Sequence, residues 1–157
     1  MKRSLLMWCL LCIALLQGCR MDEQKKIREC VDDIDLPVSC ITIRNDDTEW
    51  WFNDVNQRLF FKVDADIEEY EEELYASGWV GGPVNAYLFL SIAHTFGDLQ
   101  TFCYQYKDSE NVYWYYKDLH TEQTWKEIDG TEYNRASYVF GMIVPDEDAI
   151  VYVRVLN

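Results

Sequence analysis

The sequence is poor in cationic residues. Its 157 residues include 14 Lys and Arg against 28 Asp and Glu, so the formal net charge is −14 at pH 7. Such a charge repels nucleic acids and anionic membrane surfaces, and it favours association with cationic partners. We therefore expect no nucleic-acid binding, and a basic protein is the expected class of partner. The alternative is that the acidity only keeps the protein soluble.

The sequence also lacks the usual marks of an enzyme or a metalloprotein. It has only two histidines, His94 and His120, and after residue 18 it contains no G-x-S-x-G, H-E-x-x-H, glycine-rich phosphate loop or paired C-x-x-C motif. Its 28 carboxylates place some pair at glycosidase spacing by chance alone, so such a pair carries no information. We predict no catalytic residue, metal site or cofactor, and a hydrolase of envelope polymers ranks as a third hypothesis.

The apolar run near the N-terminus, Leu5–Leu16, is too short to cross a membrane. Its twelve residues reach roughly 18 Å as a helix, against a hydrocarbon core of ~30 Å. Lys2 and Arg3 precede the run, and Gly18 follows it closely. A positive start, a short apolar segment and a small residue are the layout of an export signal, which the pattern predicts here.

The end of this segment, Leu16-Gln17-Gly18-Cys19, resembles the lipobox of bacterial lipoproteins. Gln17 departs from the small or apolar residue that is more usual at its position. The resemblance implies cleavage before Cys19 and lipidation of its sulfur with two or three acyl chains, which together anchor a protein stably. By the sorting rule of this class, Arg20 in place of Asp implies the periplasmic face of the outer membrane.

These features divide the chain into three expected parts. Residues 1–18 form the signal peptide, residues 19–35 form the lipidated N-terminus and a polar tether with room for a short helix, and residues 36–157 form a single globular domain. Loss of residues 1–18 removes two basic residues and no acid, which leaves 12 basic and 28 acidic residues and a net charge of −16.

Three cysteines remain after Cys19, namely Cys30, Cys40 and Cys103. An exported protein can form disulfides, but the pairing of three thiols does not follow from sequence. A Cys30–Cys40 bond is the first expectation, because it closes a short loop, and a bond from either to Cys103 is the second. A catalytic thiol is the least expected, since no histidine motif accompanies any of them.

Two helices are expected in the middle of the chain. In residues 66–77, Ile67, Tyr70 and Leu74 share one helical stripe, with Asp66 as an N-cap and Gly78 as the end. Residues 84–96 are apolar nearly all round, which favours a buried helix by length, with a central strand left open.

The remaining segments favour strands. Three early strands are predicted at 38–43, 49–52 and 58–63, and three hairpins follow, pairing 101–107 with 112–118, 123–128 with 131–135, and 137–144 with 150–156. The predicted class is therefore α+β, an antiparallel sheet built from consecutive hairpins with two central helices.

Seven acids crowd positions 64–73, and four of them are expected on the outer face of the first helix: Glu68, Glu69, Glu72 and Glu73. Their i, i+4 like-charge pairs each destabilise an isolated helix by ~0.2–0.5 kcal/mol. A basic partner would relieve this repulsion, so these residues and Trp79, as an aromatic anchor, are the predicted partner-binding set. A helix face that is merely solvated is the alternative.

Aromatic residues cluster at Trp50-Trp51-Phe52 and at Tyr113-Trp114-Tyr115-Tyr116. Neighbours on a strand point to opposite faces, so one of each pair is either exposed for binding or covered by a second layer. The acidic helix and residues 77–107 faintly resemble small acidic immunity proteins of bacterial toxin systems. That resemblance implies an acidic protein-binding module, such as an inhibitor of a basic exported protein; the alternative is a structural or cell-wall-binding lipoprotein of the envelope.

Overall fold

The computed structural model describes residues 25–37, 42–43, 49–52, 56–64, 67–128 and 136–156. The chain divides into two compact units, Met1–Asp33 and Ile34–Asn157. In the first unit, residues 25–33 are helical. Cys19 and the lipobox lie outside the described residues, so lipidation stays a prediction. No helix in the described ranges has the length and hydropathy needed to span a bilayer.

The described part of the second unit begins with three strands, continues with short helices that a short strand interrupts, and ends with three strands. In chain order the described elements are β1 (Thr42–Ile43), β2 (Glu49–Phe52), β3 (Asn56–Asp64), η2 (Ile67–Tyr70), α2 (Glu71–Ala76), β4 (Val80–Gly81), α3 (Ala86–Ile92), η3 (Ala93–Thr95), η4 (Gly97–Leu99), α4 (Gln100–Tyr106), β5 (Tyr113–Asp118), β6 (Tyr138–Val144), η5 (Pro145–Glu147) and β7 (Ala149–Val155).

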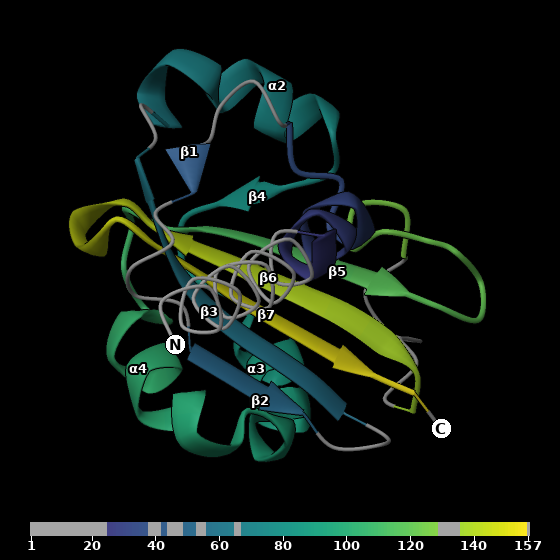
Figure 1. Cartoon of the computed structure of the whole chain (residues 1–157). Coiled ribbons are helices and arrows are strands. Elements are labelled where there is room, and N and C mark those ends of the chain that lie inside the picture. Colours follow the sequence, from purple (N-terminus) through teal and green to yellow (C-terminus); the bar gives the residue numbers. More distant parts are fainter. Residues whose placement is uncertain are drawn as a thin grey trace, which may run out of the picture. The chain divides into compact units, whose positions relative to one another are not determined.

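In the described part of the chain, seven strands form one antiparallel sheet, in the order β1-β3-β7-β6-β5-β4, with β2 also paired to β3 (Figure 1). β1 pairs with the end of β3 at Val63 and Asp64, whereas β2 pairs with residues 57–60. The strands β5, β6 and β7 are consecutive neighbours, and β6 and β7 form a hairpin around η5.

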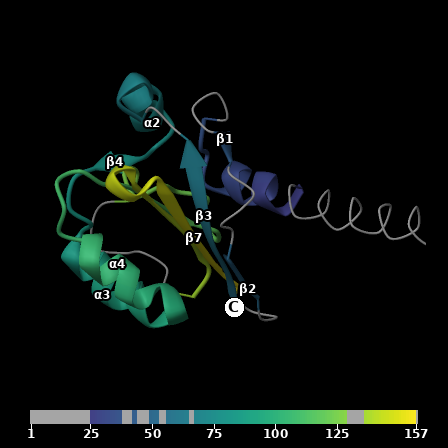
Figure 2. The same ribbon diagram turned by 60° about the vertical axis from the view of Figure 1, so that its left-hand side comes forward.

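Helices α3 and α4 lie against one face of the sheet, away from α2 (Figure 2). Asn85 begins α3, since its side chain accepts hydrogen bonds from the backbone amides of Tyr87 and Leu88 at 3.1 Å each. Phe89 and Phe96 then enter the core formed with the sheet, where Phe96 stacks on Phe140 with ring centroids 5.3 Å apart. This layer buries the even-numbered positions of β5 and β6.

The opposite face of the sheet is also buried. Trp79 is 0% exposed, and its ring lies 5.5 Å from that of Tyr115. Its indole N–H donates to the carbonyl oxygen of Ile34 at 3.0 Å. The ring also lies above Gly141, where a Cβ atom would approach the Trp79 Cη2 to 2.9 Å and the Ile34 Cγ2 to 3.3 Å. Gly141 therefore makes room for the tryptophan on this face.

The α+β class with an antiparallel sheet is confirmed, as are the predicted strands at 49–52, 58–63, 112–118, 137–144 and 150–156. The helix at 84–96 is confirmed as α3 followed by η3, which excludes the strand left open there. The first predicted helix is present in two pieces, η2 and α2, and its expected cap, Asp66, lies outside the described residues.

Two strand predictions are wrong. Residues 101–106 form most of α4, because Leu99, Phe102, Cys103 and Tyr106 are spaced at i, i+3, i+4 and i+7 and pack with the same core as α3. Residues 123–128 form turns, with a single bridge between Thr124 and Lys117. The second predicted strand of that hairpin, 131–135, lies outside the described residues.

Replacing Gly141 with Ala should lower the free energy of unfolding by ~1–3 kcal/mol, because the added methyl group overpacks the contact with Trp79. Chemical denaturation of the single variant, of Trp79→Phe and of the double variant measures the effect. Phenylalanine lacks the Cη2 atom, so the double variant should be less destabilised than the sum of the two singles. Additive losses of stability would show that contact with Trp79 is not the reason why position 141 needs glycine.

Candidate functional site

The helix α2 presents three consecutive glutamates in its first turn. Glu72 and Glu73 are exposed, whereas Glu71 is partly buried. The Glu71 Oε1 accepts hydrogen bonds from the hydroxyl groups of Tyr75 at 2.8 Å and Tyr113 at 3.0 Å. Glu71 therefore fixes α2 against β5, while the side chains of Glu72 and Glu73 are exposed at the surface.

The end of α2 forms a Schellman motif, which places the next residues. The Gly78 amide donates to the Tyr75 carbonyl at 3.3 Å, and the Trp79 amide donates to the Leu74 carbonyl at 3.0 Å. Gly78 adopts φ +95°, a left-handed conformation suited to glycine, which confirms it as the end of the helix. The motif turns Trp79 into the core and leaves Ser77 and Gly78 at the surface.

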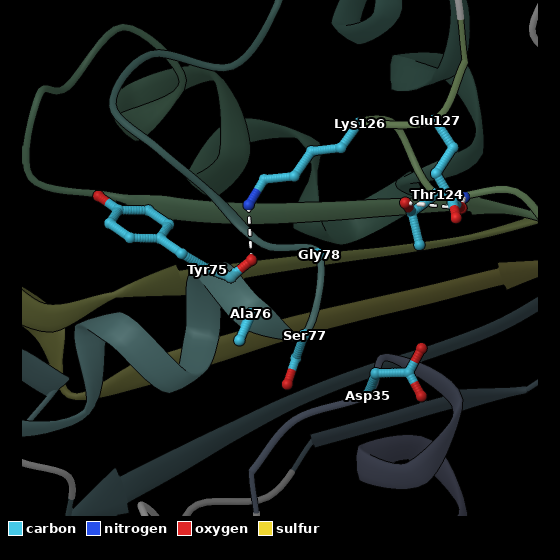
Figure 3. Close-up of a pocket in the computed structure, with 8 residues that line it drawn as sticks. All are labelled: Asp35, Tyr75, Ala76, Ser77, Gly78, Thr124, Lys126 and Glu127. Carbon is cyan, nitrogen blue, oxygen red and sulfur yellow. Dashed lines mark hydrogen bonds between the residues drawn. The ribbon is translucent and has the colours of Figure 1, made fainter.

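An open hollow of about 460 Å³ lies beside this helix end (Figure 3). Three separate segments contribute to its wall: the end of α2, the turn before Ile128, and the chain that precedes β1. The lining residues are Asp35, Tyr75, Ala76, Ser77, Gly78, Thr124, Lys126 and Glu127. A Cβ atom on Gly78 would lie 3.2 Å from Thr124 Cγ2, so the glycine lets the two sides of the wall meet closely.

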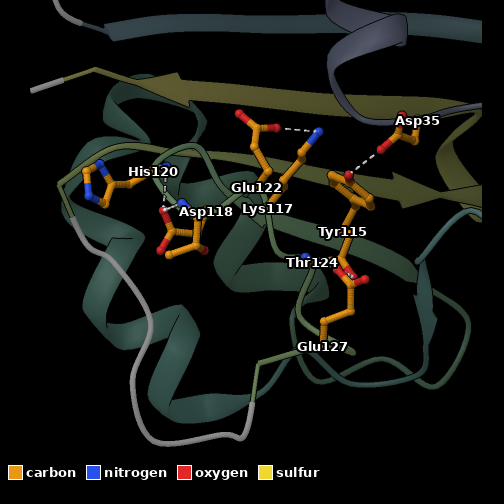
Figure 4. A network of polar contacts seen from close by, with 9 residues as sticks. Asp35, Tyr115, Lys117, Asp118, His120, Glu122, Thr124 and Glu127 are labelled. Carbon is orange, nitrogen blue, oxygen red and sulfur yellow. Dashed lines mark hydrogen bonds and ion pairs between the residues drawn. The ribbon is translucent and has the colours of Figure 1, made fainter.

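Two carboxylates in the wall are held by hydroxyl and amide donors (Figure 4). Tyr115 donates its hydroxyl to Asp35 Oδ2 at 2.6 Å. Glu127 Oε2 accepts from the Thr124 amide at 2.8 Å and from the Thr124 hydroxyl at 3.0 Å. Burial, followed by the bond to Asp35, raises the pKa of Tyr115, so its phenol stays protonated and keeps donating.

The bonds from Thr124 have the opposite effect on Glu127. The backbone amide, followed by the hydroxyl, stabilises the charged carboxylate and holds the pKa of Glu127 below its ordinary value. Glu127 is therefore ionised at neutral pH. Together with Asp35 it brings negative charge to the hollow in a fixed orientation.

The cation in the wall is engaged elsewhere. Lys126 Nζ donates to the backbone carbonyl oxygen of Tyr75 at 2.7 Å and lies 5.3 Å from the centroid of the Tyr75 ring. Neither Asp35 nor Glu127 has an ion pair with a residue in the described ranges. The hollow thus carries two carboxylates against one ammonium group, and that ammonium group ties α2 to the 124–127 turn.

The structure corrects the predicted role of Trp79. Its side chain is fully buried and donates to Ile34, so it cannot anchor a partner from the surface. Of the four predicted glutamates, Glu72 and Glu73 lie together on α2, whereas the side chains of Glu68 and Glu69 lie outside the described set. The adjacent aromatics of Tyr113–Tyr116 are all buried, because both faces of β5 are covered.

The structure describes two of the three cysteines, Cys30 and Cys103. Cys30 lies in the helical residues 25–33, but Cys40 lies outside the described residues, so the bond between them stays a prediction. Cys103 is a free thiol, fully buried on α4, and burial raises its pKa to about 12. Such a thiol is protonated at neutral pH and is not a nucleophile.

Asp35 and Glu127 were not predicted as site residues. Asp35 stands 80 positions before its partner Tyr115, and no local pattern links them. Glu127 had a signal in the sequence, because Thr124-Trp125-Lys126-Glu127 has the spacing of a capping box, in which the glutamate returns to the amide of the threonine. In the described ranges, no three His, Cys, Asp or Glu side chains are grouped to hold a metal ion.

Known proteins add no guide to the site, because no family model matches the chain and no curated protein or solved structure is significantly similar to it.

Replacing Thr124 with Ala should raise the pKa of Glu127 part of the way to its ordinary value, because one of its two donors is lost and the backbone amide remains. A carboxyl-carbon NMR titration of Glu127 measures the shift. Thr124→Ser keeps the hydroxyl and should leave the pKa low. An unchanged pKa in the alanine variant would show that the hydroxyl contributes nothing to the charge of the hollow.

Proposed function

We propose that the chain is a lipid-anchored lipoprotein of the bacterial outer membrane whose folded domain binds a basic protein. The observation that carries the binding role is the exposed acidic face of α2, where Glu72 and Glu73 follow one another beside a hollow that adds two more carboxylates. Clustered charge of one sign speeds the encounter with an oppositely charged surface and selects against anionic competitors.

Within this role, an inhibitor or immunity protein is the more specific function that we favour, because its binding surface is ordered before the partner arrives. Glu71 ties α2 to Tyr113 of β5, and β5, like β6 and β7, is buried almost throughout, so the acidic surface is attached to a well-packed sheet. A surface that is ordered before binding loses little conformational entropy when the partner docks. The bound partner would be a basic exported protein, neutralised where its own function needs free cationic side chains.

The alternative, a cell-wall-binding lipoprotein, has less support. It relies on the aromatic clusters. The rings of Tyr113–Tyr116 are buried in the sheet rather than presented for stacking on sugars, and the side chains of Trp50–Phe52 lie outside the described set. The large exposed aromatic residues in the described ranges are Tyr75, Tyr87 and Tyr104, of which Tyr75 lies in the wall of the hollow. Charge thus gives the better account of the surface.

The anchor is tested by replacing Cys19 with Ala in the full chain, expressed in a bacterium with two membranes. We expect labelled palmitate to enter the unaltered protein and not the variant, because the thiol is the predicted site of acylation. Cys30→Ala is the control and should keep the label, and Arg20→Asp should shift the protein from the outer to the inner membrane fraction. Label on the Cys19→Ala variant would contradict the lipobox assignment.

The binding role is tested by charge reversal in the full-length protein, isolated in detergent and used to capture partners from envelope and co-cultured cells. Glu72→Lys/Glu73→Lys should weaken capture of a basic stoichiometric partner by about 10-fold or more. The capture that remains should depend less on salt concentration than capture by the unaltered protein. Asp98→Lys/Asp108→Lys makes the same change in net charge at exposed positions outside α2 and should have little effect.

Two outcomes would oppose this proposal. Equal losses in both double variants would mean that only net charge matters. Capture of purified peptidoglycan that persists at high salt, with no protein partner, would favour the cell-wall-binding alternative.

A further inference from the structure

We propose that the hollow beside α2 receives one arginine side chain of the basic partner, with Asp35 and Glu127 as its carboxylate acceptors. This inference rests on the proposed function, and it adds the position of the contact and the chemistry of the group that enters. The hollow is a separate feature from the acidic face of α2, because Glu72 and Glu73 are not among its lining residues.

Size is the first argument. A volume of about 460 Å³ lies in the range of ligand sites, ~300–1,000 Å³. The hollow is open to solvent, so a side chain projecting from a protein surface can reach its lining residues, which Figure 3 draws. The methyl group of Ala76 and the ring of Tyr75, which is 39% exposed, give the wall an apolar part suited to a methylene stem.

The state of the two carboxylates is the second argument. Each is oriented by donors that carry no formal charge, namely Tyr115 for Asp35 and Thr124 for Glu127. These bonds engage Asp35 Oδ2 and Glu127 Oε2, so one oxygen of each carboxylate remains to accept from an incoming group. A carboxylate paired with an internal lysine would already have its charge compensated and would attract an external cation less strongly.

The choice of arginine over lysine follows from Lys126. Its ammonium group is already bound at the rim, to the Tyr75 carbonyl, and a second compact ammonium ion would be repelled at short range. A guanidinium group spreads its charge over a plane, is less strongly hydrated and offers five donors, so it can donate to two carboxylates and carries a less concentrated charge beside Lys126. A guanidinium also stacks on an aromatic ring such as Tyr75.

The test uses two small probes of equal charge, N-acetyl-arginine amide and N-acetyl-lysine amide, titrated into the full-length protein in detergent and followed by backbone amide NMR. We expect the arginine probe to shift the amides of Gly78 and Thr124 and to saturate in the millimolar range, and the lysine probe to bind more weakly. In Asp35→Asn/Glu127→Gln the arginine probe should bind about fivefold more weakly or worse, as expected for two exposed charge contacts.

Two further variants separate the hollow from general effects. Asp98→Asn/Asp148→Asn removes two charges from positions that do not line the hollow, and it should bind the arginine probe like the unaltered protein. Ala76→Trp keeps both carboxylates and fills the space, so it should abolish binding of the arginine probe. It remains an informative test if Asp35→Asn/Glu127→Gln folds poorly. Unfolding curves of each variant establish that the fold is retained.

Equal binding of the two probes, or unchanged binding in Asp35→Asn/Glu127→Gln and in Ala76→Trp, would overturn the inference. Its failure is distinguishable from failure of the proposed function. If the captured basic partner is lost in Glu72→Lys/Glu73→Lys but kept in Ala76→Trp, the acidic surface is the interface and the hollow is not part of it.

Discussion

The sheet of this domain is apolar on both faces, and the positions of the other elements depend on that constraint. All seven residues of β6 are buried, which a single covering layer cannot achieve because neighbouring side chains point to opposite sides. The helices α3 and α4 cover one face. On the other face Trp79 lies over Gly141, and the absence of a side chain at that glycine lets the indole ring come close to the sheet.

The position of Trp79 in turn shapes the surface. The chain must leave α2 and enter the core within three residues, and the Schellman motif at Gly78 performs this change of direction. The same motif leaves the end of α2 exposed next to the turn that contains Thr124. The hollow is thus a consequence of how the domain buries its tryptophan. Trp79 does not contact a partner itself, and its burial determines where the end of α2 lies at the surface.

Patterns that operate over a few residues predicted the elements well. The strands β6 and β7, two apolar runs on either side of a polar turn, followed from strand propensity and turn chemistry, and the glycine at the end of α2 followed from helix-capping chemistry. Residues 101–107 taken alone favour a strand, and the helical spacing of apolar residues in α4 becomes visible only when Leu99 is included. The burial of Tyr113–Tyr116 was left open, because a strand covered on both faces has no alternation that could reveal it.

The site could be predicted only in part from the sequence, because some of its contacts join distant parts of the chain. The bond from Tyr115 to Asp35 joins residues 80 positions apart, so only the folded chain shows it. The contact of Glu127 with Thr124 is local and follows the capping-box spacing, which was readable in advance. A sequence of this kind therefore indicates which residues carry charge, and the fold decides which of those charges become neighbours.

The distribution of cations completes this argument. Lys62 donates to the Glu147 backbone and Lys117 pairs with Glu122 at 3.0 Å, while Lys107 pairs with Asp108. Lys126 has a comparable internal role at the Tyr75 carbonyl. With 14 basic residues for 28 acids, every lysine used in this way leaves acids elsewhere without a counter-charge. The carboxylates of the hollow are instead oriented by hydroxyl groups and one backbone amide, and this is the feature on which the proposed arginine contact rests.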